Sequence, residues 1–244
     1  MSIWAMADLH LAVSVSAKNM DVFGSVWEGY MEKIQDHWKG VVKSDDLVLL
    51  PGDICWAMRL EEAKADLNWI DRLPGTKVMI RGNHDYWWSS AKKMAAVFPP
   101  SIHFLQNTAY HWQDIAIGGT RLWDTPEYNF NEFVHFQENR RAKLSEKQED
   151  PAIFERELER LKMSLRLMDP TAKLKIAMTH YPPLGADLKN SRTSAILEEF
   201  NIDICVFGHL HNLKKEVPLF GKARGIEYYL TAADYLDFRL LKLR

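Results

Sequence analysis

Short apolar runs alternate with amphipathic segments along the first part of the chain. The apolar runs, typical of buried strands, cover 3–8, 47–51 and 77–81. Between them, apolar residues recur at steps of three and four, which predicts helices at 23–38, at about 60–72 and from a Ser89-Ser90 cap to Val97. This alternation predicts an α/β fold with a parallel sheet and right-handed crossovers.

The second part of the chain is less regular but again rich in strand-like runs. Strands are expected at 103–105, 109–112, 115–118, 173–179, 203–207, 225–231 and 236–243, and a helix at about 191–200. No repeat, low-complexity segment or linker interrupts this pattern. We therefore expect a single domain over 1–244, with a partly helical insertion at about 120–170.

The insertion contains one clear helical pattern. Its apolar residues stand at steps of four and three, at Phe154, Leu158, Leu161, Leu165 and Met168. A helix with such a narrow apolar stripe can pack on the core, cover a site as a lid, or pair with a second subunit in a homo-oligomer. Packing on the core is favoured, but the sequence leaves these alternatives open.

Composition narrows the class of protein. The 244 residues carry a formal net charge of −2, so no overall field attracts nucleic acid. Cys55 and Cys205 lie in or beside apolar runs, which predicts buried free thiols in a reducing compartment. No apolar run approaches the length of a membrane span. Because the chain reaches a candidate ligand at Asp8, removal of a leader would destroy the site, and we expect a cytoplasmic protein.

Residues that bind metals follow five of the predicted strands. In chain order the blocks are Asp8-Leu9-His10, Gly52-Asp53, Gly82-Asn83-His84-Asp85, His180 and Gly208-His209-Leu210-His211. Ligands of open α/β sheets bind beyond the carboxyl ends of the strands. We therefore expect these blocks to converge on one site.

The donor groups in these blocks suit divalent metal ions. Carboxylate, amide and imidazole groups favour Mn, Fe, Zn, Ni or Co over ions that prefer thiolates. The candidate ligands are Asp8, His10, Asp53, Asn83, His180, His209 and His211. They are too many for one tetrahedral ion but suit two ions that share a bridging carboxylate. Two ions roughly 3.5–4 Å apart can hold a phosphate group and activate a water molecule at neutral pH.

The order of the blocks resembles that of the calcineurin-like metallophosphoesterases. The family pattern is Asp-x-His, Gly-Asp, Gly-Asn-His-(Asp/Glu), a lone His and Gly-His-x-His, and all five blocks occur in order between Asp8 and His211. The resemblance implies two stacked mixed β-sheets flanked by helices, a four-layer αββα sandwich. It also implies a dinuclear phosphoester hydrolase in which a metal-bound hydroxide attacks phosphorus.

The resemblance assigns the candidate ligands to two ions. One ion takes Asp8, His10 and His211, the other takes Asn83, His180 and His209, and Asp53 bridges the two. By the same resemblance, His84 lies near the leaving group as a proton donor or charge stabiliser, and Asp85 orients it. This role suits an expelled alkoxide, which needs a proton.

The chain departs from the family pattern at one position. Many members place a second Asp three positions after the Asp of the Gly-Asp block, where this chain has Trp56. The missing carboxylate is not among the expected ligands. The departure therefore concerns the groups around the metal site more than the site itself.

Aromatic and basic residues near the blocks are candidates for substrate contacts. Trp87 and Tyr181 flank ligand blocks and either stack on a substrate or pack in the core. Arg59, Arg81 and Arg121 either grip a phosphate or serve in surface or ion-paired roles. Arg121 is the first of these to test, because it follows a Gly-Gly pair at a strand end.

These residues predict a phosphate-ester hydrolase that acts on a phosphodiester. The alternatives are a phosphomonoesterase or protein phosphatase, and a catalytically weak protein-binding scaffold of the same fold. A scaffold would be expected to have lost the catalytic position that is not a ligand. His84 and Asp85 are both present, which favours the enzyme.

Overall fold

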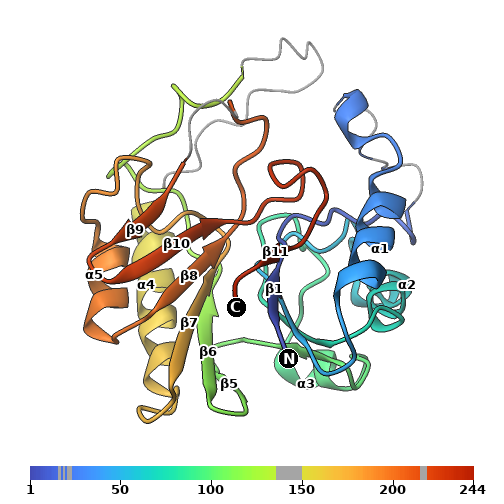
Figure 1. The fold of residues 1–244 in the computed structure, drawn as a ribbon, viewed down its shortest axis with the longest axis horizontal. Coiled ribbons are helices and arrows are strands. Elements are labelled where there is room, and N and C mark those ends of the chain that lie inside the picture. Colours follow the sequence, from blue (N-terminus) through green and yellow to red (C-terminus); the bar gives the residue numbers. More distant parts are fainter. Residues whose placement is uncertain (16–17, 19, 21–23, 136–149, 215–218) are drawn as a thin grey trace.

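Two β-sheets pack face to face between two layers of helices in the computed structural model of the chain (Figure 1). The structure describes residues 1–15, 18, 20, 24–135, 150–214 and 219–244. Helices α1, α2 and α3 cover one sheet, and α4 and α5 cover the other (Figure 1). This is the four-layer αββα sandwich expected from the sequence.

The first sheet has the strand order β11-β1-β2-β3-β4. Its strands are β1 (Ile3–Ala5), β2 (Leu47–Leu50), β3 (Thr76–Met79), β4 (Ile102–Phe104) and β11 (Leu241–Lys242). Strands β1 to β4 run parallel, and β11 pairs antiparallel with β1. The helices on this side are α1 (Tyr30–Val41), α2 (Leu60–Asp71) and α3 (Ala91–Ala95). The alternation of strands and helices in the first part of the chain is thus confirmed.

The second sheet has the order β5-β6-β7-β8-β10-β9. Its strands are β5 (Tyr110–Trp112), β6 (Ile115–Thr120), β7 (Leu174–Thr179), β8 (Ile204–Phe207), β9 (Gly221–Ala223) and β10 (Ile226–Leu230). The central four strands are parallel, and the edge strands β5 and β9 are antiparallel to their neighbours. The helices on this side are α4 (Pro151–Arg166) and α5 (Arg192–Glu199). Both sheets are therefore mixed.

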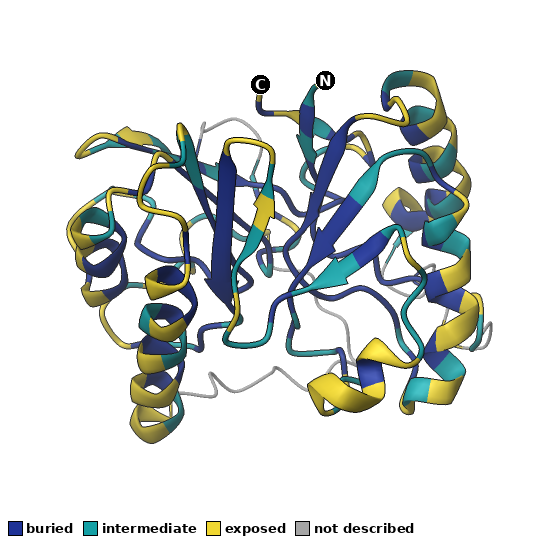
Figure 2. Cartoon of the chain, turned by 90° about the horizontal axis from the view of Figure 1, so that it is seen from below, coloured by how far each residue is buried: buried dark blue, intermediate teal, exposed yellow. Residues whose placement is uncertain are grey.

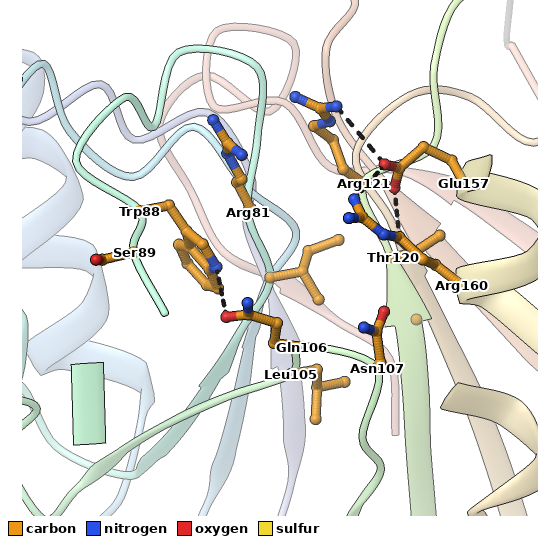
Figure 3. Close-up of a pocket in the computed structure, with 12 residues that line it drawn as sticks. Arg81, Trp88, Ser89, Leu105, Gln106, Asn107, Thr120, Arg121, Glu157 and Arg160 are labelled. Atoms are coloured by element: carbon orange, nitrogen blue, oxygen red, sulfur yellow. Dashed lines mark hydrogen bonds and ion pairs between the residues drawn. The ribbon is translucent and has the colours of Figure 1, made fainter. Parts of the chain in front are cut away.

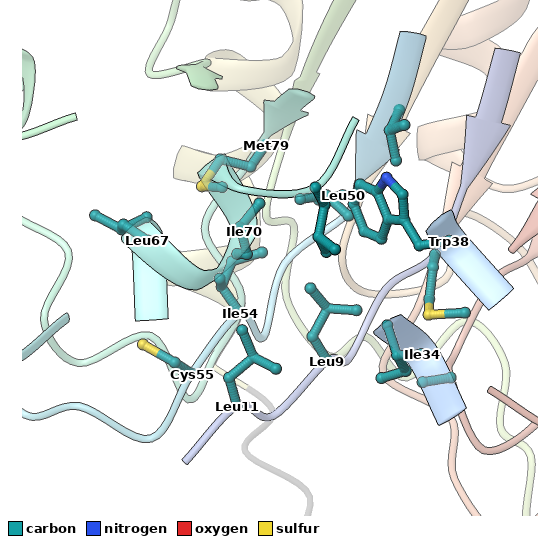
Figure 4. Packing of buried hydrophobic residues seen from close by; sticks show 14 of the residues in the cluster. Leu9, Leu11, Ile34, Trp38, Leu50, Ile54, Cys55, Leu67, Ile70 and Met79 are labelled. Carbon is teal, nitrogen blue, oxygen red and sulfur yellow. The ribbon is translucent and has the colours of Figure 1, made fainter. Parts of the chain in front are cut away.

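Strand side chains alternate between two cores. In β2, Leu47 and Leu49 face the other sheet, whereas Val48 and Leu50 face the helices. Figure 4 shows Leu50 in the helix-side core with Trp38 of α1. Both faces are buried, which explains why the central strands read as unbroken apolar runs. In Figure 2 most strands are buried and the helices expose their outward faces.

Two boundaries differ from the expectation. A 3-10 helix at Ser25–Trp27 and a left-handed Gly29, with φ of 61°, precede α1, so the expected helix at 23–38 is broken near its start. Position 23 lies outside the described residues. The expected strand at 236–243 shrinks to Leu241–Lys242, because Asp237 and Phe238 have positive φ angles of 51° and 58° and form a turn.

Helix α4 packs on the second sheet. Its apolar stripe, which includes Phe154, Leu158, Leu161 and Leu165, is buried in the core of that sheet. Ser164 is also buried and accepts a hydrogen bond from the Gly119 amide of β6, at 2.8 Å. The helix therefore plays the packing role favoured from the sequence. Residues 136–149 of the expected insertion lie outside the described residues.

The two cysteines and the membrane prediction can also be compared with the structure. Cys55 and Cys205 are buried free thiols, as expected. Within the described ranges, no helix has the length and apolar character needed to cross a bilayer.

Candidate active site

The five polar blocks come together where the carboxyl ends of the two sheets meet. Strands β1, β2 and β3 lead to Asp8, His10, Asp53 and Asn83, and strands β7 and β8 lead to His180, His209 and His211. Main-chain hydrogen bonds join neighbouring blocks: the Asp8 amide donates to Gly52 O and the Gly208 amide to His180 O, at 3.0 and 3.1 Å. The expected convergence of the strand ends is therefore present.

Asp8, His10 and His211 form one compact group. The Nε2 atoms of His10 and His211 are 3.3 Å apart, and His211 Nε2 lies 3.6 Å from Asp8 Oδ1. One ligand atom from each of the three side chains lies within 4.8 Å of those from the other two. Asp8 and His10 are almost fully buried, whereas the His211 side chain is 28% exposed. The group has the geometry of a metal site that opens to solvent at His211.

A second group surrounds Asn83. Its Oδ1 lies 2.6 Å from His180 Nε2 and 3.1 Å from His209 Nδ1. Asp53 stands between the groups, because its Oδ2 is 3.5 Å from His180 Nε2 and 3.7 Å from His10 Nε2. One carboxylate oxygen thus faces both groups, which is the position a bridging ligand requires.

The charges in this site fit bound cations. Burial and the charges of Asp8 and Asp85 raise the pKa of Asp53, since three carboxylates share a site removed from water. Burial lowers the pKa of His10 and takes that of His180 to about 3, so both rings are neutral at pH 7 with a lone pair available. Clustered buried carboxylates beside neutral imidazoles are a donor set that divalent cations balance. The residues present therefore fit two such ions.

His211 has a partner that the sequence analysis missed. Its Nδ1 is hydrogen-bonded to Asp234 Oδ1 at 2.9 Å, and Asp234 Oδ2 accepts from the Asn212 amide at 3.0 Å. Burial lowers the pKa of His211, but the charge of Asp234 and this hydrogen bond outweigh burial and raise it above 6.5. Such a carboxylate fixes the tautomer and direction of a metal-binding histidine. Asp234 follows strand β10, so it shares with the other blocks a position after an apolar, strand-like run.

His84 contributes both its main chain and its ring. Its amide donates to Asp53 Oδ1 at 2.8 Å and thereby orients the central carboxylate. Its ring centroid lies 5.7 Å from that of His10, beside the first group. Burial lowers the pKa of His84. Its Nδ1 is buried and, among the described residues, has no hydrogen-bond partner.

Asp85 binds main-chain amides instead of the His84 ring. Its carboxylate accepts from the amides of Gly82, Asp53 and Ile54 at 2.7, 3.0 and 2.9 Å, and from the indole N–H of Trp87 at 3.1 Å. The orientation of His84 by Asp85 that the resemblance implied is therefore not the arrangement in the structure. The reason is that the loops after β2 and β3 carry buried amides, which need acceptors. Asp85 supplies these and fixes the two loops together.

The ligand loops hold unusual backbone conformations. Asp8, His10, Asp53 and His209 have positive φ angles of 57°, 44°, 53° and 73°. For residues with a side chain, this region costs roughly 1–2 kcal/mol each. Such strain clusters at functional sites, where the surrounding structure enforces it. These four side chains are therefore directed into the site against a local backbone preference.

Glycines in the blocks permit close approach. A Cβ atom on Gly82 would overlap the Asp53 carboxylate, and one on Gly208 would overlap the Asp8 carboxylate. The main chain of each block therefore packs directly against a candidate ligand of another block. This explains why Gly precedes Asn83 and His209.

The aromatic candidates for substrate contact, Tyr181 and Trp87, are buried. Tyr181 is 3% exposed, and its ring centroid lies 4.0 Å from that of His209. Trp87 is 2% exposed and lies in the helix-side core. Trp56, at the position where the chain departs from the family pattern, stacks on His10 with centroids 4.9 Å apart and planes at 20°. Tyr181 and Trp87 therefore offer little free surface to a substrate, and Trp56 packs against a candidate ligand.

Arg121 combines the two roles considered from the sequence, an ion pair and a position for phosphate contact. Its Nη2 is 3.7 Å from a Glu157 carboxylate oxygen, and its guanidinium lies 4.5 Å from the Trp123 ring centroid. Its carbonyl accepts from the amides of His180 and Tyr181, at 3.1 and 2.9 Å. Arg121 is thus ion-paired and also immediately beside the candidate site.

Solved structures that are similar to this one match nearly the whole chain. The structure of phosphopantetheinyl hydrolase (PptH) from Mycobacterium tuberculosis is similar, with a TM-score of 0.51 and 14% sequence identity over 99% of this chain and 95% of that one. A protein of unknown function, AQ665 from Aquifex aeolicus, matches with a TM-score of 0.48 and 15% identity over the same shares of the two chains. At these identities the likeness to PptH concerns the fold alone. None of the curated proteins matches the chain.

The family comparison covers the whole set of candidate ligands. The model of the calcineurin-like phosphoesterases matches residues 1–213, which include every block from Asp8 to His211. The chain therefore belongs to the calcineurin-like phosphoesterase family.

Proposed function

We propose that this protein is a metal-dependent phosphoester hydrolase with two divalent ions in its active site. The convergence of nitrogen and oxygen ligands from both sheets around Asp53 carries this proposal. Bound ions would neutralise the phosphate oxygens and lower the pKa of a water molecule. Mn, Fe, Zn, Ni and Co all suit these ligands.

The ligands divide between the two ions as the family resemblance implies. Asp8, His10 and His211 would hold one ion, Asn83, His180 and His209 the other, and Asp53 both. The short distances within each group and the central Asp53 oxygen support this division.

We propose that His84 gives a proton or a hydrogen bond to the leaving oxygen. Its ring borders the first ligand group, and its Nδ1 has no partner in the described part of the chain. Asp85 acts indirectly, because its hydrogen bonds fix the loops that carry Asp53 and His84. Asp85 is therefore a positioning residue in this proposal.

A comparison of two chromogenic esters tests the function. Protein loaded with Mn²⁺ is expected to hydrolyse bis(4-nitrophenyl) phosphate faster than 4-nitrophenyl phosphate, because we propose the preference for diesters that the sequence predicts. His84→Ala is expected to lower kcat by about 100-fold or more, the usual range for loss of acid–base catalysis. It should keep its metal, because the main-chain amide that binds Asp53 remains.

The control variant is His111→Ala, since His111 is an exposed histidine of β5. Full activity of His84→Ala would remove His84 from the mechanism. Faster hydrolysis of the monoester would overturn the diester preference. If neither ester is hydrolysed while both ions are bound, the scaffold alternative gains over the enzyme.

Three expectations, on domain organisation, cellular location and oligomeric state, stay predictions. We propose that residues 1–244 act as one domain and that the protein works in the cytoplasm. A homo-oligomer also stays a prediction.

A further inference from the structure

A small cavity lies next to the candidate active site, between the strand ends of the two sheets (Figure 3). Its volume is about 140 Å³. The polar residues that line it are Arg81, Ser89, Gln106, Asn107, Thr120, Arg121, Glu157 and Arg160. None of the seven candidate metal ligands lines it. It is thus a separate compartment beside the ligands.

The cavity and the metal ligands share two chain segments. Arg81 stands two positions before Asn83, in the loop after β3. Arg121 follows β6, and its carbonyl binds the amides of His180 and Tyr181. The cavity is therefore adjacent to the loops that carry the candidate ligands Asn83 and His180.

The cavity is positively charged. Three guanidinium groups and one carboxylate line it, which gives a net charge of +2. Glu157 is 1% exposed and lies 2.6 Å from Arg160 Nη1 and 3.7 Å from Arg121 Nη2, while Thr120 donates to it at 2.8 Å. Glu157 therefore fixes two of the guanidinium groups but compensates only one positive charge.

The side chain of Arg81 has an N–H group without an acceptor among the described residues. Its Nε is buried and, in the described part of the chain, has no hydrogen-bond partner. Figure 3 shows Arg81 and Arg121 rising from different strand ends on either side of the cavity. A buried N–H without an acceptor is unfavourable, and an anion in the cavity would supply the acceptor.

We propose that this cavity binds a second phosphate group of the substrate, so that the enzyme acts on phosphate esters that carry another phosphate. The proposal rests on the phosphoester hydrolase function proposed above. Pockets for whole small molecules measure roughly 300–1,000 Å³, so this cavity takes one group. A phosphate carries about −1.5 to −2 charges at pH 7 and matches the charge of +2 better than a carboxylate does. Guanidinium groups also match phosphate oxygens in bidentate pairs.

Binding of phosphonates that cannot be hydrolysed tests this substrate class. Calorimetric titration of Mn²⁺-loaded protein compares alkane α,ω-bisphosphonates of increasing length with alkyl monophosphonates and phosphonocarboxylates of equal length. At one length or more, the bisphosphonate is expected to bind at least about tenfold more tightly than the monophosphonate. Arg81→Gln is expected to reduce this ratio to about one, and Arg81→Lys to retain part of it, because a lysine keeps the charge.

The matched control is Arg166→Gln, which removes an exposed arginine from the end of α4 and should leave the ratio unchanged. No preference at any length, or a preference that survives Arg81→Gln, would overturn the proposal. Equal binding of the phosphonocarboxylate would overturn the assignment to phosphate. Failure of the proposed function is distinguishable, because it appears as absent hydrolysis of both nitrophenyl esters, whereas the binding ratio needs no turnover.

Discussion

At the scale of single residues, His211 depends most clearly on a neighbour. It is the more exposed member of the first ligand group, so packing restrains it less than it restrains His10. Its hydrogen bond to Asp234 supplies the missing restraint and fixes which ring nitrogen faces Asp8. Asp234 is in turn held by the Asn212 amide. We expect this chain of contacts to set the affinity of the first metal position.

Replacement of Asp234 tests this dependence. Asp234→Asn is expected to lower the affinity for one Mn²⁺ ion by about 10–100-fold, the usual effect of losing such a carboxylate, while the second ion binds as before. Metal titration of both proteins measures it. Asp187→Asn, which changes an exposed carboxylate paired with Lys189, is the control. Equal affinity of Asp234→Asn and the wild type for both ions would contradict the positioning role.

Single residues also show where sequence reasoning succeeds and fails. The candidate ligands were found because each block follows an apolar strand, and parallel strands bring such ends together. Asp234 also follows an apolar strand, but no family motif marks it, so the sequence does not single it out. The acceptor role of Asp85 is not predictable from sequence, because two of its amide partners, Asp53 and Ile54, come from a different loop.

At the scale of elements, a buried lysine joins β3 to helix α2. Lys77 is 1% exposed, and its ammonium donates to the carbonyls of Leu73 and Asp71 near the end of α2. Carbonyls at a helix C-terminus lack partners within the helix and favour a cation. Burial nevertheless lowers the pKa of Lys77 from 10.5 to about 8, while the charge of Asp71 opposes the shift.

This pKa predicts a pH-dependent stability. Between about pH 8 and 10.5 the unfolded chain keeps a proton on Lys77 that the folded protein has lost. The free energy of unfolding therefore rises with pH over this range. Below pH 8 the full cost of burying the charged ammonium applies. Urea unfolding at pH 7.5 and pH 10 compares the wild type with Lys77→Met. Relative to the variant, the wild type is expected to gain about 1–2 kcal/mol at the higher pH. An unchanged difference between the two proteins would contradict the lowered pKa.

Elements with strong periodicity were predictable, and short ones were not. Helix α2 and the central strands lie within a few residues of their expected positions, because burial of one or both faces requires apolar residues at regular positions in the sequence. Strand β9 was missed, since its three residues at the sheet edge are partly exposed and carry no such pattern. The break before α1 depends on the left-handed Gly29, which a helical period does not reveal.

At the scale of the whole molecule, the candidate site exists only because the two sheets stack. The first sheet supplies Asp8, His10, Asp53 and Asn83, and the second supplies His180, His209 and His211. Apolar side chains from both sheets form the core between them, including Leu49 of β2 and Ile176 of β7. This core fixes the relative position of the ligands. Asp53 lies where the two halves meet, so it should matter for both ions.

The number of ions bound per chain tests this account most directly. Equilibrium titration of metal-free protein with Mn²⁺ is expected to give two ions for the wild type and for Asp45→Asn, a control at an exposed carboxylate. Asp53→Asn is expected to lose both ions at concentrations that saturate the wild type, because its carboxylate faces both ligand groups. Retention of two ions by Asp53→Asn, or binding of only one by the wild type, would contradict the shared metal centre.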